Sequence, residues 1–150
     1  MRVIFDTNIL ILSQLGKPAT SIMQAALMDT PVKSLAFYYS EIMLAEYRNA
    51  LEQVCLDYPR DFYPNQVAHL LSEIERRGIL IHPTIALTTE DENACIHEPD
   101  NRFLECAIEA QADYIITINT NHFPTIYQLP DNRVIKTVPP GRFERILFRD

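Results

Sequence analysis

The sequence predicts an α/β fold in which a mostly parallel sheet lies between two layers of helices. Short apolar runs at residues 2–5 and 114–117 contain β-branched residues and lack polar alternation, as expected for strands buried on both faces. Segments with the apolar spacing of helices separate these runs. Because strands that alternate with helices form parallel sheets covered on both faces, we expect a three-layer α/β/α arrangement.

Apolar runs, capping residues and helix-breaking residues predict the strands and helices in order along the chain. Strands are expected over residues 2–5, 33–39, 79–81, 114–117 and 134–138. Helices are expected from Pro18 to the break at 29–31, from Glu41 to about Leu56, over the apolar positions 67–74, from Thr89, from Asp100 to Ala110 and over 143–148. The first strand is expected to end in a loop at residues 6–8. Ser40 is expected to cap the helix after it, Gly78 occupies the position of a C′ glycine, and residues 89–92 have capping-box spacing.

Composition narrows the possible functions. The chain has 150 residues, of which 47% are hydrophobic, and a net charge of −7, which suits one core and one domain over residues 1–150. No apolar run approaches the roughly 18–20 residues of a membrane helix, and no signal-peptide pattern opens the chain, so we expect a cytoplasmic protein without membrane contact. Three isolated glycines cannot build a glycine-rich phosphate loop, and three cysteines without CxxC spacing disfavour disulfides and thiolate zinc sites. Carboxylates must therefore carry any chemistry.

Polar residues directly follow two of the expected strands. Asp6 comes after the first strand, and Asn119 comes after the strand at 114–117. Ligands of open parallel sheets bind beyond the carboxyl ends of the strands, so these side chains are expected at one edge. Asp100 precedes the helix that leads into the second of these strands, and we expect it to face the same edge, although helix capping alone also explains an aspartate there.

Glu46 is a further candidate because apolar residues surround it on a helical wheel. Ile42, Met43 and Ala50 lie nearest to it in the expected helix. A carboxylate on an apolar face is costly unless a charge or a metal ion compensates it. The alternative is a glutamate at the helix edge that pairs with an arginine.

The three carboxylates Asp6, Glu46 and Asp100 together favour a divalent cation. Crowded carboxylates raise one another's pKa and cannot all stay ionised without a cation. Oxygen ligands favour Mg²⁺ or Mn²⁺ over Zn²⁺. Such a site suits the hydrolysis of a phosphodiester by a metal-activated water.

Four sequence blocks occur in a characteristic order. They are Val3–Leu10 (VIFDTNIL), Ser40–Glu46, Pro99–Glu105 (PDNRFLE) and Ala112–Thr117 (ADYIIT). Together they resemble the PIN domain family, and in particular the toxins of VapBC-type toxin–antitoxin systems, from residue 2 to about Pro140. The resemblance implies a three-layer α/β/α fold and a Mg²⁺- or Mn²⁺-dependent ribonuclease that is often a homodimer and is inhibited by a small antitoxin.

The resemblance also assigns roles to residues. Asp6, Glu46 and Asp100 match the first three acidic metal ligands of the family, and Asn8 matches the polar residue that accompanies the first. Asn119 stands where many members carry a fourth acid; its amide offers an oxygen to a metal or a water but cannot act as a base. Accessory contributions are expected from Thr7, Thr117, Glu105 and Asn121. Arg102 is a candidate for substrate binding, whereas His97 and His122 are expected to be ordinary loop or packing residues.

Two functions of different classes remain open. The first is an endoribonuclease that acts as the toxin of a toxin–antitoxin system. The second is a PIN-like module that binds RNA or protein without turnover. The neutral Asn119 and the acidic balance of the chain motivate this hypothesis. A phosphatase with an aspartyl nucleophile is disfavoured because residues 6–8 lack the second aspartate of that signature.

Overall fold

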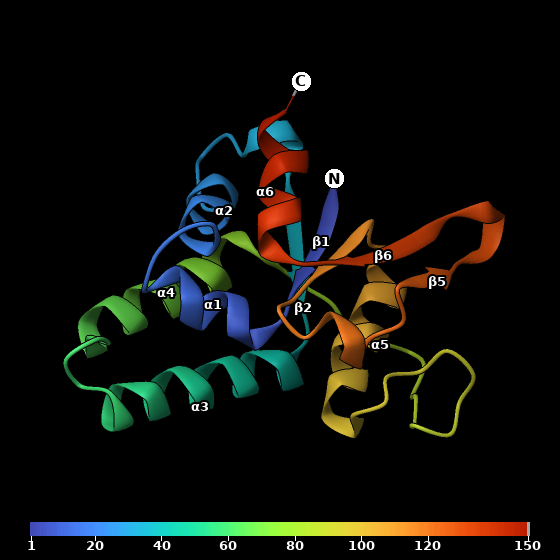
Figure 1. Cartoon of the computed structure of the whole chain (residues 1–150), viewed down its shortest axis with the longest axis horizontal. Helices are drawn as coiled ribbons and strands as arrows, with labels where there is room; N and C mark the ends of the chain where they lie inside the picture. Colours follow the sequence, from blue (N-terminus) through green and yellow to red (C-terminus); the bar gives the residue numbers. More distant parts are fainter. Residues whose placement is uncertain (150) are drawn as a thin grey trace.

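A six-stranded sheet runs through the centre of the computed structural model, which describes residues 1–149 (Figure 1). Its strands are β1 (Arg2–Phe5), β2 (Ala36–Tyr39), β3 (Ile79–Leu80), β4 (Tyr114–Ile116), β5 (Ile126–Gln128) and β6 (Val134–Val138). They lie in the order β3-β2-β1-β4-β6-β5, and only β5 runs antiparallel to its neighbour. The prediction of a mostly parallel sheet is therefore confirmed.

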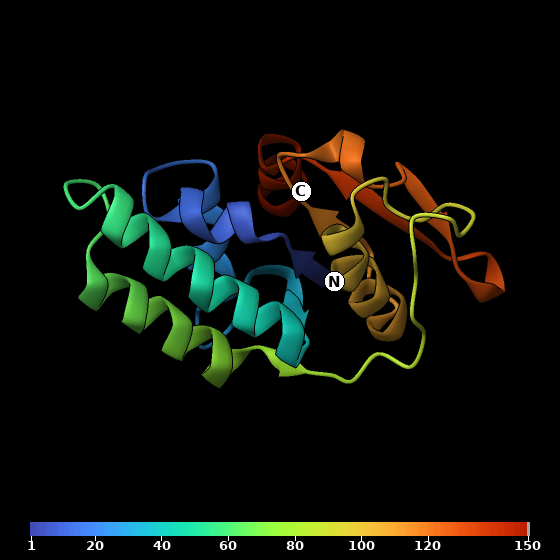
Figure 2. The same ribbon diagram turned by 90° about the horizontal axis from the view of Figure 1, so that it is seen from below.

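Helices cover both faces of this sheet. They are α1 (Thr7–Ser13), α2 (Ala19–Ala26), α3 (Glu41–Asp57), α4 (Pro64–Arg77), α5 (Asn101–Ala110) and α6 (Pro140–Phe148). α5 packs against β1, β2 and β4, whereas α1, α2 and α6 form a connected group on the other side. α3 and α4 lie side by side as a long helical pair (Figure 2). The three-layer prediction is confirmed, and within residues 1–149 no helix has both the length and the apolar character that a membrane crossing needs.

The central strand β1 sets the position of the polar residues that follow it. Val3, Ile4 and Phe5 are buried, as expected for a strand covered on both faces. Phe5 pairs with Ile116 of β4, and the next amide, that of Asp6, donates to the Ile116 carbonyl at 3.0 Å. Asp6 therefore leaves the sheet beside the end of β4.

The loop expected after the first strand is wrong, because α1 begins at Thr7, directly after β1. Asp6 has an extended backbone and its side chain accepts a hydrogen bond from the Thr7 amide at 2.8 Å, which is the geometry of an N-cap. One aspartate thus ends a strand and starts a helix without an intervening loop.

Several other boundaries differ from the prediction. β2 begins at Ala36 instead of residue 33, because Lys33 and Ser34 adopt positive φ angles of 52° and 55° in a short 3-10 turn. α2 begins after Pro18 and ends at Ala26, and α6 begins at Pro140, before the predicted start. The short antiparallel strand β5 was not predicted.

The helix expected from Thr89 does not form. The Thr88 amide donates to the Asp91 carboxylate at 2.7 Å, and the Thr88 hydroxyl accepts from the Glu90 amide at 3.3 Å. Short polar side chains that bond to nearby backbone in this way compete with helix formation. The segment is therefore a turn.

Gly78 follows α4, as predicted, but its role is different from that of a left-handed C′ glycine. Its backbone is extended, with φ −74° and ψ 162°. A Cβ atom there would lie 2.6 Å from the Phe37 ring, 2.7 Å from the Ile74 carbonyl oxygen and 2.8 Å from the Tyr39 ring. The glycine is required by the lack of space between the end of α4 and the aromatic rings of β2, and not by its backbone conformation.

We expect Gly78→Ala to lower the free energy of unfolding by about 1–3 kcal/mol, the usual cost of overpacking. Gly141→Ala is the matched control, because a Cβ atom there meets nothing within 4 Å and alanine is the better helix former in α6. Urea denaturation of both variants measures the difference. Equal stabilities of the two variants would contradict the steric explanation.

Candidate active site

Asp6 is the buried centre of the candidate site. Its side chain belongs to a residue that is only 5% exposed, at the junction of β1 and α1. Oδ1 accepts from the Thr7 backbone amide, and Oδ2 accepts from the Thr117 hydroxyl at 2.6 Å and from the side-chain amide of Asn8 at 3.1 Å. These three donors fix the carboxylate, and a fourth lone-pair direction stays free for a ligand.

Glu46 reaches the same place from α3. The Thr7 hydroxyl donates to Glu46 Oε2, and the Thr7 amide donates to Asp6, so one residue of the β1–α1 junction holds both carboxylates. Tyr47, the next residue of α3, is buried and donates its hydroxyl to the Phe5 carbonyl, which docks the helix onto the end of β1. Of the apolar neighbours expected around Glu46, Met43 is fully buried but Ile42 is 60% exposed, so Glu46 lies at the edge of the apolar face of α3. The charges of Asp6 and Asp100 also act on it.

Asp100 is the third carboxylate, and its charge acts on both Asp6 and Glu46. It occupies the N-cap position of α5, but its side chain makes no capping hydrogen bond, and its backbone is helical (φ −68°, ψ −21°) at the end of the 3-10 turn Glu98–Asp100. The alternative that helix capping alone explains this aspartate is therefore not supported. Its side chain is 14% exposed and faces the imidazoles of His97 and His122. Oδ2 of Asp100 is buried and accepts no hydrogen bond.

The pKa values of Asp6 and Glu46 are both raised, which shows that their ionised forms are disfavoured in the folded protein. Burial raises the pKa of Asp6, and the negative charge of Asp100 raises it further against the lowering effect of the Thr117 hydrogen bond. Burial also raises the pKa of Glu46, and the charges of Asp6 and Asp100 add to it, while the Thr7 bond lowers it. The site therefore favours a positive charge among Asp6, Glu46 and Asp100.

The end of β4 contributes amides and hydroxyls. Thr117 is fully buried, and its hydroxyl also accepts from the Asn119 amide at 3.0 Å and lies 3.3 Å from the Asn8 amide nitrogen. Asn8 Oδ1 accepts from the Ile118 amide at 3.2 Å. Asn119 is partly buried beside this network, whereas Asn121 is exposed. The structure thus brings Thr7, Asn8 and Thr117 to the carboxylates, and the Asn119 backbone joins them through Thr117.

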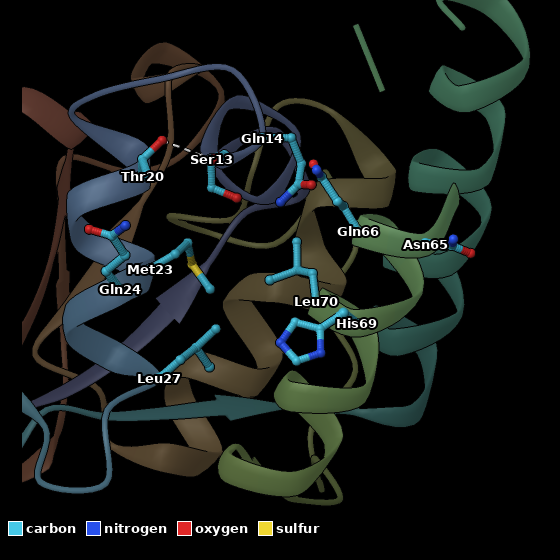
Figure 3. A pocket seen from close by; sticks show the side chains of 10 residues that line it. All are labelled: Ser13, Gln14, Thr20, Met23, Gln24, Leu27, Asn65, Gln66, His69 and Leu70. Carbon is cyan, nitrogen blue, oxygen red and sulfur yellow. Dashed lines mark hydrogen bonds between the residues drawn. The ribbon is translucent and has the colours of Figure 1, made fainter. Parts of the chain in front are cut away.

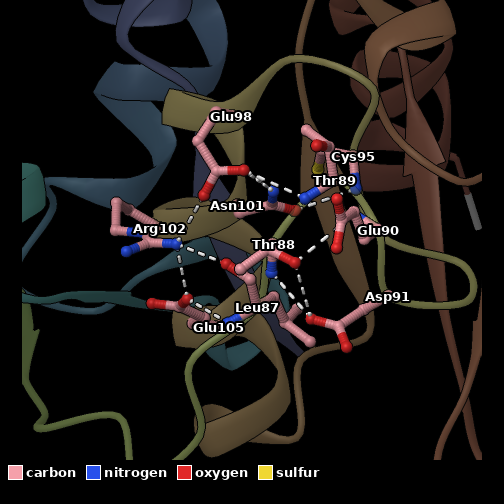
Figure 4. A network of polar contacts seen from close by, with 10 residues as sticks. All are labelled: Leu87, Thr88, Thr89, Glu90, Asp91, Cys95, Glu98, Asn101, Arg102 and Glu105. Carbon is pink, nitrogen blue, oxygen red and sulfur yellow. Dashed lines mark hydrogen bonds and ion pairs between the residues drawn. The ribbon is translucent and has the colours of Figure 1, made fainter.

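Arg102 and Glu105 lie in a different network, which ties the segment before α5 to that helix (Figure 4). Arg102 Nη2 donates to the Leu87 carbonyl at 2.6 Å and contacts Glu98 at 3.2 Å and Glu105 at 2.9 Å. Glu105 is 6% exposed and accepts from the Leu87 amide at 2.7 Å. Both side chains are thus engaged with the protein, and Glu105 is not a surface residue.

The sequence interpretation missed the two histidines beside Asp100. Nδ1 of His97 lies 3.5 Å and Nδ1 of His122 lies 3.3 Å from Asp100 Oδ2. The spacing His97–Asp100 was the available signal for one of them, since residues three apart share a face of a helical turn.

A hollow of about 580 Å³ lies apart from the carboxylates, between α1, α2 and α4 (Figure 3). Met23, Leu27 and Leu70 point into it, and polar side chains such as His69 surround them. None of the three carboxylates lines this hollow. Its apolar walls suit a hydrophobic partner and not a phosphodiester.

Comparisons with known proteins agree with this arrangement. The PIN domain family model matches residues 2–121. No curated protein matches the sequence. Among solved structures, the chain is similar to the crystal structure of VapBC2 from Rickettsia felis bound to a DNA fragment from their promoter, with a TM-score of 0.54, 16% identity, and coverage of 91% of this chain and 98% of that one. The similarity to the solved structure shows the fold alone. The match to the family model covers most of the chain. The chain therefore belongs to the PIN domain family.

Proposed function

We propose that the protein is a metal-dependent endoribonuclease that hydrolyses phosphodiester bonds of RNA. PIN domains are generally metal-dependent nucleases. The observation that supports the proposal is the electrostatic coupling of three carboxylates: the charge of Asp100 raises the pKa of Asp6, and the charges of Asp6 and Asp100 raise the pKa of Glu46. Asp6 lies beside the carboxyl ends of β1 and β4. This edge is the usual ligand position of an open parallel sheet.

The donor atoms present suit a divalent cation. Asp100 Oδ2 is a buried oxygen without a hydrogen-bond partner, and Asp6 keeps a free lone-pair direction. Carboxylate oxygens prefer Mg²⁺ or Mn²⁺, and we propose Asp6, Glu46 and Asp100 as the ligands. When bound, the ion would activate a water and neutralise charge on the scissile phosphate.

The residues around the carboxylates have positioning roles in this proposal. The Thr7 amide and hydroxyl hold Asp6 and Glu46, and Thr117 and Asn8 prevent rotation of Asp6. Asn119 is neutral at the fourth position, so it can orient a water or a phosphate oxygen but cannot take a proton. Asn121 is an exposed candidate for an accessory contact with the substrate.

We further propose that the protein is the toxin of a toxin–antitoxin pair and acts in the cytoplasm. The similar structure from Rickettsia felis is that of VapBC2, which supports a small antitoxin as partner. A homodimer is part of the same proposal. The competing proposal is a binding module without turnover, which the neutral Asn119 favours.

Asp6→Asn is expected to lower RNA cleavage at least about 100-fold, the scale on which a single electrostatic stabiliser acts. Asparagine keeps an oxygen for the Thr7 amide but removes the charge. The assay compares products from a mixed RNA panel with Mg²⁺, with Mn²⁺ and with a chelator. Asp61→Asn, at an exposed position, is the control. Metal-dependent cleavage that persists in Asp6→Asn would reject the assignment, and metal binding by wild type without any product would favour the binding module.

Glu46→Gln is expected to stabilise the metal-free protein at neutral pH. Because the pKa of Glu46 is raised from 4.5, the folded state binds its proton more tightly than the unfolded chain, and the free energy of unfolding falls as pH rises through the raised pKa. Glutamine removes this loss, so the difference in the free energy of unfolding between variant and wild type is absent below pH 4.5, grows between pH 4.5 and the raised pKa, and is complete above it.

Thermal melts with chelator, from acid to neutral pH, measure this difference. Glu52→Gln, at an exposed position of the same helix, is the control. Added Mg²⁺ is expected to favour wild type over Glu46→Gln at neutral pH. A stability difference that does not change with pH would contradict the electrostatic explanation.

A further inference from the structure

The imidazoles of His97 and His122 both lie beside the carboxylate of Asp100. The two rings have centroids 5.7 Å apart and are tilted by 35°. One ligand atom from each of His97, Asp100 and His122 lies within 4.8 Å of the other two. Among residues 1–149, this is the set of metal-binding side chains that includes nitrogen donors.

Backbone contacts hold the two histidines in place. His97 precedes the 3-10 turn that carries Asp100, and His122 ends the 3-10 turn Thr120–His122. The Ile96 amide donates to the His122 carbonyl at 3.2 Å, which joins the two segments next to the rings. The His122 amide donates to the Asn119 carbonyl at 2.9 Å, which connects this group to the end of β4. The three side chains are thus brought together by the fold.

The distances from Asp100 to the two imidazoles are within the range of an ion pair but longer than those of a hydrogen bond. Asp100 Oδ2 lies 3.5 Å from His97 Nδ1 and 3.3 Å from His122 Nδ1, yet it is buried and accepts no hydrogen bond. A tetrahedral Zn²⁺ with ligands at 2.0–2.2 Å places neighbouring ligand atoms roughly 3.3–3.5 Å apart. The two measured separations therefore match two edges of a zinc coordination tetrahedron.

We propose that His97, His122 and Asp100 form a second cation site that prefers Zn²⁺ to Mg²⁺. Two nitrogens and one oxygen are a zinc-type donor set, because imidazole binds transition metals and Mg²⁺ takes oxygen ligands. The His97 side chain is 61% exposed and that of His122 is 34% exposed, so a fourth position is open to water or to a substrate oxygen. Three protein ligands and one open position are the pattern of zinc sites that exchange ligands.

This site goes beyond the proposed nuclease, since it needs neither RNA nor turnover, but the two share Asp100. A shared ligand makes the sites interdependent. A Zn²⁺ ion bound by the two histidines and Asp100 would compete for Asp100 with a cation held by Asp6 and Glu46. Zn²⁺ binding is therefore expected to change the affinity of the carboxylate site for Mg²⁺. Metal choice at this edge of the sheet would then depend on which ions are present.

Calorimetric titration of the untagged, metal-free protein with Zn²⁺ and with Mg²⁺ tests the site directly. His97→Asn and His122→Asn are each expected to weaken Zn²⁺ binding at least about tenfold, since even residues behind a metal ligand have effects of that size. Their effect on Mg²⁺ affinity is expected to be small. The chain has four histidines, so His69→Asn and His82→Asn, both at exposed positions, are matched controls that should bind Zn²⁺ like wild type.

Cobalt absorption reports the donor set independently of affinity. Co²⁺ bound by two imidazoles in a four-coordinate site gives visible bands much stronger than those of Co²⁺ bound by six oxygens. These bands are expected in wild type and in the controls and absent from the double variant of His97 and His122, with circular dichroism confirming that this variant folds.

The possible results separate this proposal from the nuclease. Two results would contradict the zinc site: a Zn²⁺ affinity that is unchanged in the folded double variant, or wild-type protein that binds Zn²⁺ no more tightly than Mg²⁺. Either result would mean that the histidines only form an ion pair with Asp100. Mg²⁺-dependent RNA cleavage that survives such a result would uphold the nuclease alone. Tight, histidine-dependent Zn²⁺ binding without any RNA product would uphold the zinc site alone.

Discussion

The buried carboxylate of Asp6 is the constraint on which the rest of the site depends. It stands where the central strand stops, it caps α1, and it accepts hydrogen bonds from Thr117 at the end of the neighbouring strand. The next residue, Thr7, holds Glu46. A single aspartate therefore joins β1, α1 and β4, and through its neighbour α3, so the geometry of the site is part of the geometry of the fold.

The same arrangement buries negative charge, and the protein's own hydrogen-bond donors compensate it only in part. Neutral donors from Thr7, Asn8 and Thr117 stabilise the charge on Asp6, but no arginine or lysine is among its hydrogen-bond partners. The nearby Arg102 pairs with Glu98 and Glu105. The chain has a net charge of −7. A bound cation would reduce the repulsion between the carboxylates and would attract an anionic polymer to this part of the surface.

Local patterns predicted most of the fold and led to the proposal of the acidic site, whereas contacts between distant segments limited the prediction. Buried strands and Ser40 as a cap were correct because apolar runs and N-caps act over a few residues. The helix expected from Thr89 failed because its side chains bond to their own turn, and α1 was missed because Asp6 starts it without a loop. The pairing of His97 with His122 depends on a backbone bond between segments far apart in sequence, which no local pattern contains.

The two outer strands of the sheet are short, and this bears on how the chain can assemble. β3 has 2 residues and β5 has 3 residues, and the 3-10 turn that opens with Pro130 follows β5 closely. Short edges with a nearby proline give an incoming strand few backbone groups to pair with, which is how soluble proteins resist edge-to-edge aggregation. Association of two copies, or of a copy with a partner protein, is therefore left to the helical surfaces and not to a sheet that continues from one molecule into the next.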